Sequence, residues 1–201
     1  MHLIDCRTFH HWAEEKGLGW EEGRVAPSFG PAHRQSPWPW PKTNGYVRPW
    51  ELADLIVAAI QAAALNAEGG FYLWPPHGRW FWESDRPFYR ISNALLGGIG
   101  IPAGFEGAAY FAEEEADALA AAVFARCFMI DEYEGNAQDD AFVYPDLGRL
   151  YVHFDDEEIT WGMAADPEPL AAFDEGLRRL GWTWLRDRER NRWSWPLPNL
   201  A

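Results

Sequence analysis

The chain contains little cysteine: Cys6 and Cys127 are the two cysteines among 201 residues, and they lie far apart. Two such thiols neither form a disulfide framework nor supply the ligands of a structural zinc site by themselves. Reduced thiols are typical of proteins in a reducing compartment. We therefore expect a cytoplasmic protein without a disulfide.

Long hydrophobic runs are also lacking. The longest apolar stretch, residues 55–65, is interrupted by Gln61 and is much shorter than the ~20 residues that cross a bilayer. The N-terminus has no basic segment followed by an apolar one. The sequence therefore predicts neither a membrane segment nor a secretory signal.

Positive charge is scarce in the middle of the chain. Residues 106–175 contain 19 acidic and 2 basic side chains, and this stretch accounts for the overall net charge of −14. Binding of nucleic acid needs clustered Lys and Arg facing the phosphates, so we expect no nucleic-acid partner. A basic protein would be attracted instead. The alternative is an acidic surface that only keeps the protein soluble.

The compact signatures of catalysis are missing as well. No Gly-x-Ser-x-Gly motif is present, and the glycines of residues 97–100 lack the Lys-Ser/Thr of a phosphate loop. Cys6 and His10 are four residues apart on a predicted helix, but no residue can be assigned to orient the histidine. His153 and Asp155 could supply two metal ligands without an identifiable third. We expect no catalytic residue, metal or cofactor, and favour a protein that is not an enzyme.

Tryptophan, in contrast, is abundant: 13 residues, several of them in W-x-W pairs. Residues two apart in an extended segment point to the same side. Each pair could therefore form a flat ledge that stacks on sugars or amines or anchors a protein interface; the alternative is that the pairs fill the core. The candidate partner- or ligand-binding aromatics are Trp38, Trp40, Trp80 and Trp82.

Carboxylates form short clusters within the acidic stretch. The candidate partner-binding residues are Asp139, Asp140, Asp155, Asp156, Glu157 and Glu158. Residues 155–158 lie between two predicted strands, where charged residues are ordinary turn formers, and no calcium-loop motif is present. Paired carboxylates could also serve acid–base chemistry, so this alternative stays open.

Hydrophobic periodicity and capping residues predict an α+β fold: a mainly antiparallel sheet of hairpins packed against three or four helices. The predicted helices are residues 6–16, 49–66, 113–128 and 167–180, while 87–101 has helical spacing but ends in glycines. The predicted strands are residues 71–74, 79–83, 105–111, 142–144, 149–154, 158–163, 182–185 and 192–195.

The whole chain, 1–201, is predicted to form one domain. A helix and a Pro/Trp-rich wrapping loop occupy residues 1–49, one helix–hairpin half 50–112, and a second 113–201. Residues 74–82 and 144–152, 70 positions apart, share the pattern aromatic-Pro-x-x-Gly-Arg followed by large apolar residues. Either two hairpins independently use a favourable turn, or the halves are pseudo-equivalent copies of one unit.

These observations favour a non-enzymatic module that binds a basic protein partner through an acidic surface with an aromatic rim. An immunity-type inhibitor of a cationic toxin would have these properties. One alternative is a small-ligand or carbohydrate-binding protein, or a hydrolase, with tryptophan ledges as platform and a carboxylate pair as acid and base. Another is a structural or assembly subunit, such as a homodimer, whose aromatics form the interface.

Overall fold

The structure is a computed structural model of residues 1–201. The parts of the chain that it describes are residues 1–20, 25–30, 33–34, 38–39, 42–43, 46–47, 49–65, 69–81, 87–127, 140–154, 159–180, 183–185 and 192–194. Within them, five α-helices are present. They are α1 (Cys6–Glu15), α2 (Pro49–Ala64), α3 (Pro87–Gly98), α4 (Ala116–Cys127) and α5 (Pro167–Arg179).

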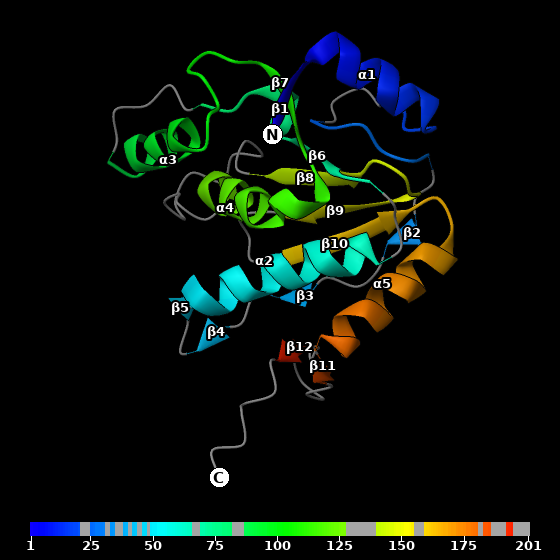
Figure 1. The fold of residues 1–201 in the computed structure, drawn as a ribbon. Coiled ribbons are helices and arrows are strands. Elements are labelled where there is room, and N and C mark those ends of the chain that lie inside the picture. The colour runs from blue at the N-terminus through cyan, green and yellow to red at the C-terminus, as the bar shows by residue number, and fades with distance from the viewer. Residues whose placement is uncertain are drawn as a thin grey trace.

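One antiparallel sheet forms the centre of the fold (Figure 1). Its eight strands run in the order β1-β7-β6-β8-β9-β10-β2, with β3 also paired to β10. These strands are β1 (His2–Asp5), β2 (His33–Arg34), β3 (Trp38–Pro39), β6 (Phe71–Trp74), β7 (Gly107–Phe111), β8 (Ala141–Pro145), β9 (Leu150–Phe154) and β10 (Ile159–Ala164). Two further pairs are β4 (Lys42–Thr43) with β5 (Tyr46–Val47), and β11 (Thr183–Leu185) with β12 (Arg192–Ser194).

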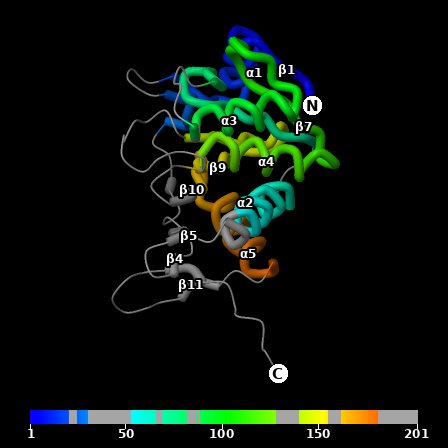
Figure 2. The backbone as a smooth tube through the Cα atoms, turned by 90° about the vertical axis from the view of Figure 1, so that its left-hand side faces the viewer, coloured from blue at the N-terminus to red at the C-terminus, as the bar shows by residue number. Residues whose placement is uncertain are grey.

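Helices cover both faces of the sheet, which explains why β8 is buried at every position. Side chains alternate between the faces: Phe71 and Leu73 of β6 pack with α2–α5, whereas Tyr72 and Trp74 pack with α1. Figure 1 shows α1 on one side of the sheet and α2, α4 and α5 on the other. Figure 2 shows the same separation from the side, with α1 and β1 at one end of the molecule and α2 and α5 toward the opposite end. The predicted α+β fold is confirmed.

Helix α1 illustrates how the local sequence builds this arrangement. Asp5 caps it, since its Oδ1 accepts a hydrogen bond from the backbone N–H of Thr8 at 2.9 Å. This hydrogen bond, with one from the Thr8 hydroxyl, lowers the pKa of the Asp5 carboxyl. Phe9 and Ala13, four residues apart, are fully buried against the sheet. The exposed side of α1 carries the charged side chains of Arg7, Glu14 and Glu15.

The predicted hairpin of residues 71–74 with 79–83 is wrong. Strand β6 pairs with β7 and β8, and Arg79 forms an isolated bridge with Glu106. The two prolines that follow β6 have no N–H for a strand ladder, and Pro76–Gly78 forms a 3₁₀ turn. Trp80 then enters the core instead of continuing a strand.

The segments with similar sequences, residues 74–82 and 144–152, begin next to each other on the paired strands β6 and β8. Leu73 of β6 pairs with Val143 of β8, 70 residues later, which is the spacing of the sequence similarity, and α2 packs against α4. After the turns the segments diverge, because β9 returns along β8 whereas Arg79 bridges to Glu106.

Candidate functional site

Among the candidate binding residues named from the sequence, Asp140 and Trp80 have described side chains, and both are buried. The Asp140 Oδ2 atom lies 3.0 Å from His153 Nε2, and the histidine ring stacks on Phe142 with centroids 4.3 Å apart. Trp80 is 0% exposed and its Nε1 donates a hydrogen bond to the Gly107 carbonyl at 2.9 Å. Trp80 is therefore a core residue rather than part of an exposed ledge. The Trp38 side chain lies outside the described residues, as do Trp40, Trp82, Asp139, Asp155, Asp156, Glu157 and Glu158.

A different group of aromatics meets at one end of the sheet. The beginnings of β1 and β6 and the ends of β7 and β8 are adjacent there, because neighbouring strands are antiparallel. Helix α1, which packs against this face of the sheet, contributes the side chain of Trp12. We call this group the sheet-end surface, and it consists of His2, Trp12, Tyr72, Tyr110 and Asp146. No sequence pattern could have identified it, because its residues come from five separate segments.

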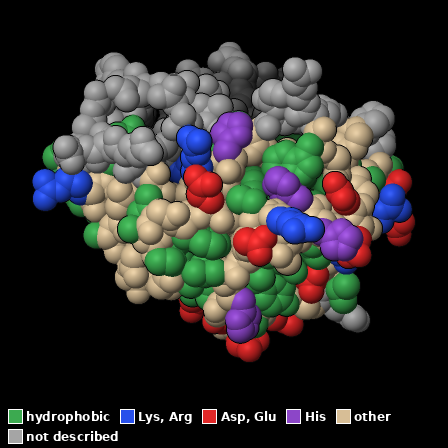
Figure 3. Space-filling view, turned by 90° about the horizontal axis from the view of Figure 1, so that it is seen from above, with side chains coloured by type: hydrophobic (Ala, Val, Ile, Leu, Met, Phe, Trp, Pro, Cys, Tyr) green, Lys and Arg blue, Asp and Glu red, His purple; other side chains and the backbone are tan. Residues whose placement is uncertain are grey.

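The rings of the sheet-end surface form a continuous ladder. The centroids of Trp12 and Tyr72 are 4.2 Å apart, and Tyr110 meets Tyr72 edge-on at 5.0 Å. His2 stacks on the far side of Tyr110 at 6.4 Å. Trp12, Tyr72 and Tyr110 are half-buried and His2 is exposed. From above, hydrophobic side chains are exposed between carboxylates and histidines on this side of the molecule (Figure 3).

Asp146 is fixed beside this ladder. Its Oδ1 accepts a hydrogen bond from Trp12 Nε1 at 3.1 Å, and its backbone N–H donates to the Gly70 carbonyl at 2.8 Å. Gly70 in turn donates its N–H to the Tyr110 hydroxyl at 3.1 Å. The tyrosine ring can lie over the backbone here because residue 70 has no Cβ.

The environment of Tyr72 keeps its phenol protonated. Burial first, and then the negative charge of Asp146 and the neighbouring Tyr110, raise the pKa of Tyr72 from 10.0 to about 12. At neutral pH the hydroxyl is therefore a hydrogen-bond donor at the edge of the aromatic ladder.

We expect the Tyr72 phenol to titrate near pH 12, measured by ultraviolet difference absorbance with Tyr72→Phe to assign the signal. Asp146→Asn should lower this pKa, yet leave it above 10.0 because burial is the larger cause. Since the folded state retains the proton longer than the unfolded chain, stability should fall as the pH rises from 10 toward 12. An unchanged Tyr72 titration in Asp146→Asn would contradict the arrangement.

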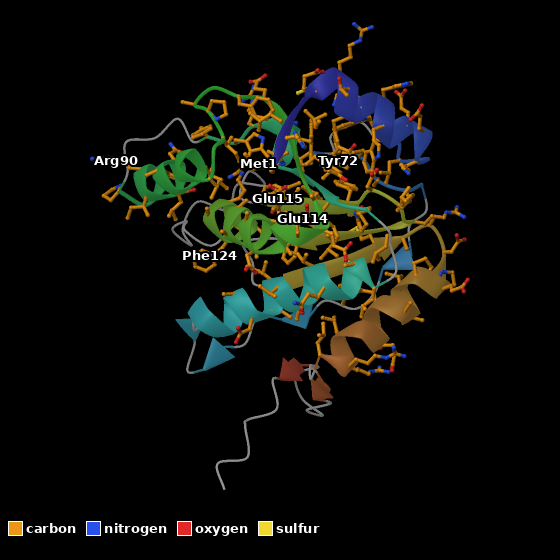
Figure 4. All side chains as sticks on the ribbon, viewed as in Figure 1. Met1, Tyr72, Arg90, Glu114, Glu115 and Phe124 are labelled. Atoms are coloured by element: carbon orange, nitrogen blue, oxygen red, sulfur yellow. The ribbon has the colours of Figure 1, made fainter. Side chains whose placement is uncertain are left out.

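An acidic turn adjoins the sheet-end surface. Residues Glu113–Glu115 follow β7 directly as a 3₁₀ turn that leads into α4. Glu115 accepts hydrogen bonds from the amino group of Met1 and, at 2.9 Å, from the Ala112 N–H, and the first of these contributes most to lowering its pKa. Glu113 and Glu114 are exposed. Figure 4 shows Met1, Glu114 and Glu115 together at the start of α4.

A hollow of about 950 Å³ lies beside α1, and its lining includes Cys6 and His10. Burial raises the pKa of the Cys6 thiol, and the His10 ring packs on Trp20 with centroids 4.4 Å apart. A thiol whose pKa is raised is a poor nucleophile at neutral pH. In the part of the chain that the structure describes, no group of three His, Cys, Asp or Glu side chains could hold a metal ion. The raised pKa of the Cys6 thiol therefore gives no support for a nucleophilic role of this residue.

Comparison with protein-family models, with curated proteins and with solved structures found no match for this chain. None of the helices within the described ranges combines the length and the apolar character that a membrane crossing requires.

Proposed function

We propose that this protein is a non-enzymatic module that binds a basic protein partner, with the sheet-end surface at the centre of the contact. The supporting observation is the half-exposed ladder of Trp12, Tyr72 and Tyr110 held beside the Asp146 carboxylate. Faces of aromatic rings attract Lys and Arg side chains. Tyrosine and tryptophan are also the residues that contribute most to protein interfaces.

The distribution of charge supports the same partner class. The exposed carboxylates of Glu113 and Glu114 follow directly after the strand that carries Tyr110. They belong to the stretch 106–175 with its 19 acidic and 2 basic side chains. Such a surface speeds association with a basic partner and selects against acidic ones. An immunity-type inhibitor of a cationic toxin is a protein of this class.

The test begins with capture of partners by the immobilised protein from lysate of the source organism, washed at low and then at high salt. The captured protein is then purified, and its affinity is measured for wild type and for the double variant Glu113→Lys/Glu114→Lys. We expect the double variant to bind about tenfold more weakly, because two attractive charges become repulsive. The difference should shrink at high salt.

The matched control changes charge elsewhere. Glu168 is exposed in the first turn of α5, which packs on β10, four strands away from β7 in the sheet. Glu168→Lys should leave the affinity within about twofold, since exposed charges beyond a Debye length are screened. Two results would count against the proposal: capture of no basic protein at low salt, or equal losses in the double variant and the control.

A further inference from the structure

The helical layer contains an apolar groove on its outer side, which we call the helix groove. It has a volume of about 680 Å³, and its lining includes Ala53 and Val57 of α2, Leu95 of α3, Ile99 just after α3, and Ala121 and Phe124 of α4. Two of the lining residues, Ala53 and Ala121, are exposed alanines. Small residues of this kind let a further helix approach closely.

Helix α3 exposes two large apolar side chains, one of which, Leu95, lines the groove. Its buried face carries Tyr89, Ser92 and Leu96. Ile91 and Leu95, one turn apart, are nevertheless 46% and 45% exposed. A helix with one apolar face against its own core and a second toward solvent is typical of a protein interaction site.

Charged side chains are distributed unevenly along the groove. Asp117 is the charged residue among the described lining side chains, and Glu113 and Glu114 precede it by about one turn. Ser92 donates a hydrogen bond to the Ala125 carbonyl, so α3 begins beside the end of α4, and Arg90 lies toward that other end. Figure 4 shows Glu114 at the beginning of α4 and Phe124 and Arg90 away from it. Basic groups of an occupant would therefore be drawn to the Asp117 end.

We infer that the helix groove receives an amphipathic helix of the basic partner, with its apolar face on the groove walls and its Lys or Arg residues beside Asp117. The inference rests on the proposed function for the class of partner and adds how that partner binds. Asp117, Ala121 and Phe124 have the i, i+4, i+7 spacing that faces a docked helix. The acidic turn Glu113–Glu115 adjoins both this groove and the sheet-end surface, so one partner can contact both.

The probes are two labelled synthetic helical peptides of equal length and identical leucine pattern, one with lysine and one with glutamate on the polar face. Fluorescence anisotropy should show saturable binding of the lysine peptide, and binding of the glutamate peptide at least about tenfold weaker. Asp117→Lys should reduce or reverse this preference. Absence of binding by the lysine peptide would overturn the inference.

Groove variants locate the binding. Leu95→Glu should weaken the lysine peptide at least about tenfold, whereas Leu147→Glu, at a leucine that is 48% exposed in the β8–β9 turn, should not. Ala121→Trp, at an exposed position, fills the groove without touching the core and should block binding as well. Circular dichroism verifies the fold of each variant. Peptide binding that both groove variants retain would overturn the inference.

Two further outcomes separate this inference from the proposed function. If the captured basic protein is sensitive to Glu113→Lys/Glu114→Lys but not to Leu95→Glu, the proposed function stands and the groove inference fails. If analytical ultracentrifugation shows a dimer that Leu95→Glu dissociates, the occupant is a second copy of this chain, and a partner helix is excluded. Conversely, the lysine peptide could bind in a way that depends on Leu95 while no basic protein is captured. That result would support the groove as a helix-binding site and contradict the proposed function.

Discussion

Gly70→Ala is expected to lower the free energy of unfolding by about 3 kcal/mol, measured by urea denaturation. A Cβ at this position would lie 2.1 Å from the Phe111 carbonyl oxygen and 2.7 Å from Cζ of Tyr110. The oxygen belongs to the backbone of β7 and cannot move without breaking the pairing of Phe71 with Phe111. Tyr110 would also be displaced, so the sheet-end surface should lose its alignment.

The control for this substitution is Gly97→Ala. Residue 97 lies in α3, and a Cβ there meets no atom within 4 Å. Alanine is the better helix former, so Gly97→Ala should raise the free energy of unfolding by roughly 0.5–1 kcal/mol. If Gly70→Ala were as stable as wild type, the close approach of β6 and β7 at this point would be disproved.

Trp80→Ala is expected to lower the free energy of unfolding by about 3–5 kcal/mol. The indole is 0% exposed, and removing it leaves a large cavity and removes the hydrogen bond to the Gly107 carbonyl. Trp80→Phe keeps most of the apolar contact and should lose about 1–3 kcal/mol, the cost of losing this buried hydrogen bond. Both variants can be measured by urea denaturation followed by circular dichroism.

This second prediction decides between the two interpretations of the W-x-W pair. A tryptophan in an exposed ledge could be replaced by alanine with a change of stability within about 0.5 kcal/mol and a loss of binding. Trp20→Ala provides the comparison, because Trp20 is 36% exposed and its ring packs on His10 and Trp74. A loss in Trp80→Ala no larger than in Trp20→Ala would contradict the buried position.

The helices could be predicted from the sequence because their signals are local. Asp5 as N-cap, Pro49 and Pro167 in first turns and the apolar stripes that follow lie within each helix itself. The structure also assigns a helix to residues 87–98, where helical spacing competed with a glycine-rich end. The acidic start of the predicted helix 113–128 forms a 3₁₀ turn before α4 begins.

The strand order and the candidate site could not be predicted, because they depend on distant pairings. Strand β1 was missed, since most of its residues are exposed and show no apolar alternation. The spacing of a W-x-W pair places two rings on one side but does not say whether that side faces the core, and for Trp80 it does. The large aromatics at alternate positions, Tyr72 and Trp74, were the available signal for the aromatic face of the sheet.

The order of the strands has a consequence for how the chain reaches its folded state. Both edge strands of the sheet come from early segments of the chain: β1 pairs with β7 at one edge, and β2 pairs with β10 at the other. During synthesis these segments emerge before their partners, which lie more than a hundred residues later, and such long-range pairing makes folding slow. Chains that lose them by proteolysis would present β7 and the Met163–Ala164 end of β10 as new strand edges, and unpaired edges are the surfaces through which β proteins aggregate. Strands β1 and β2 thus shield β7 and the end of β10, two strands that are longer and more apolar than the strands that cover them.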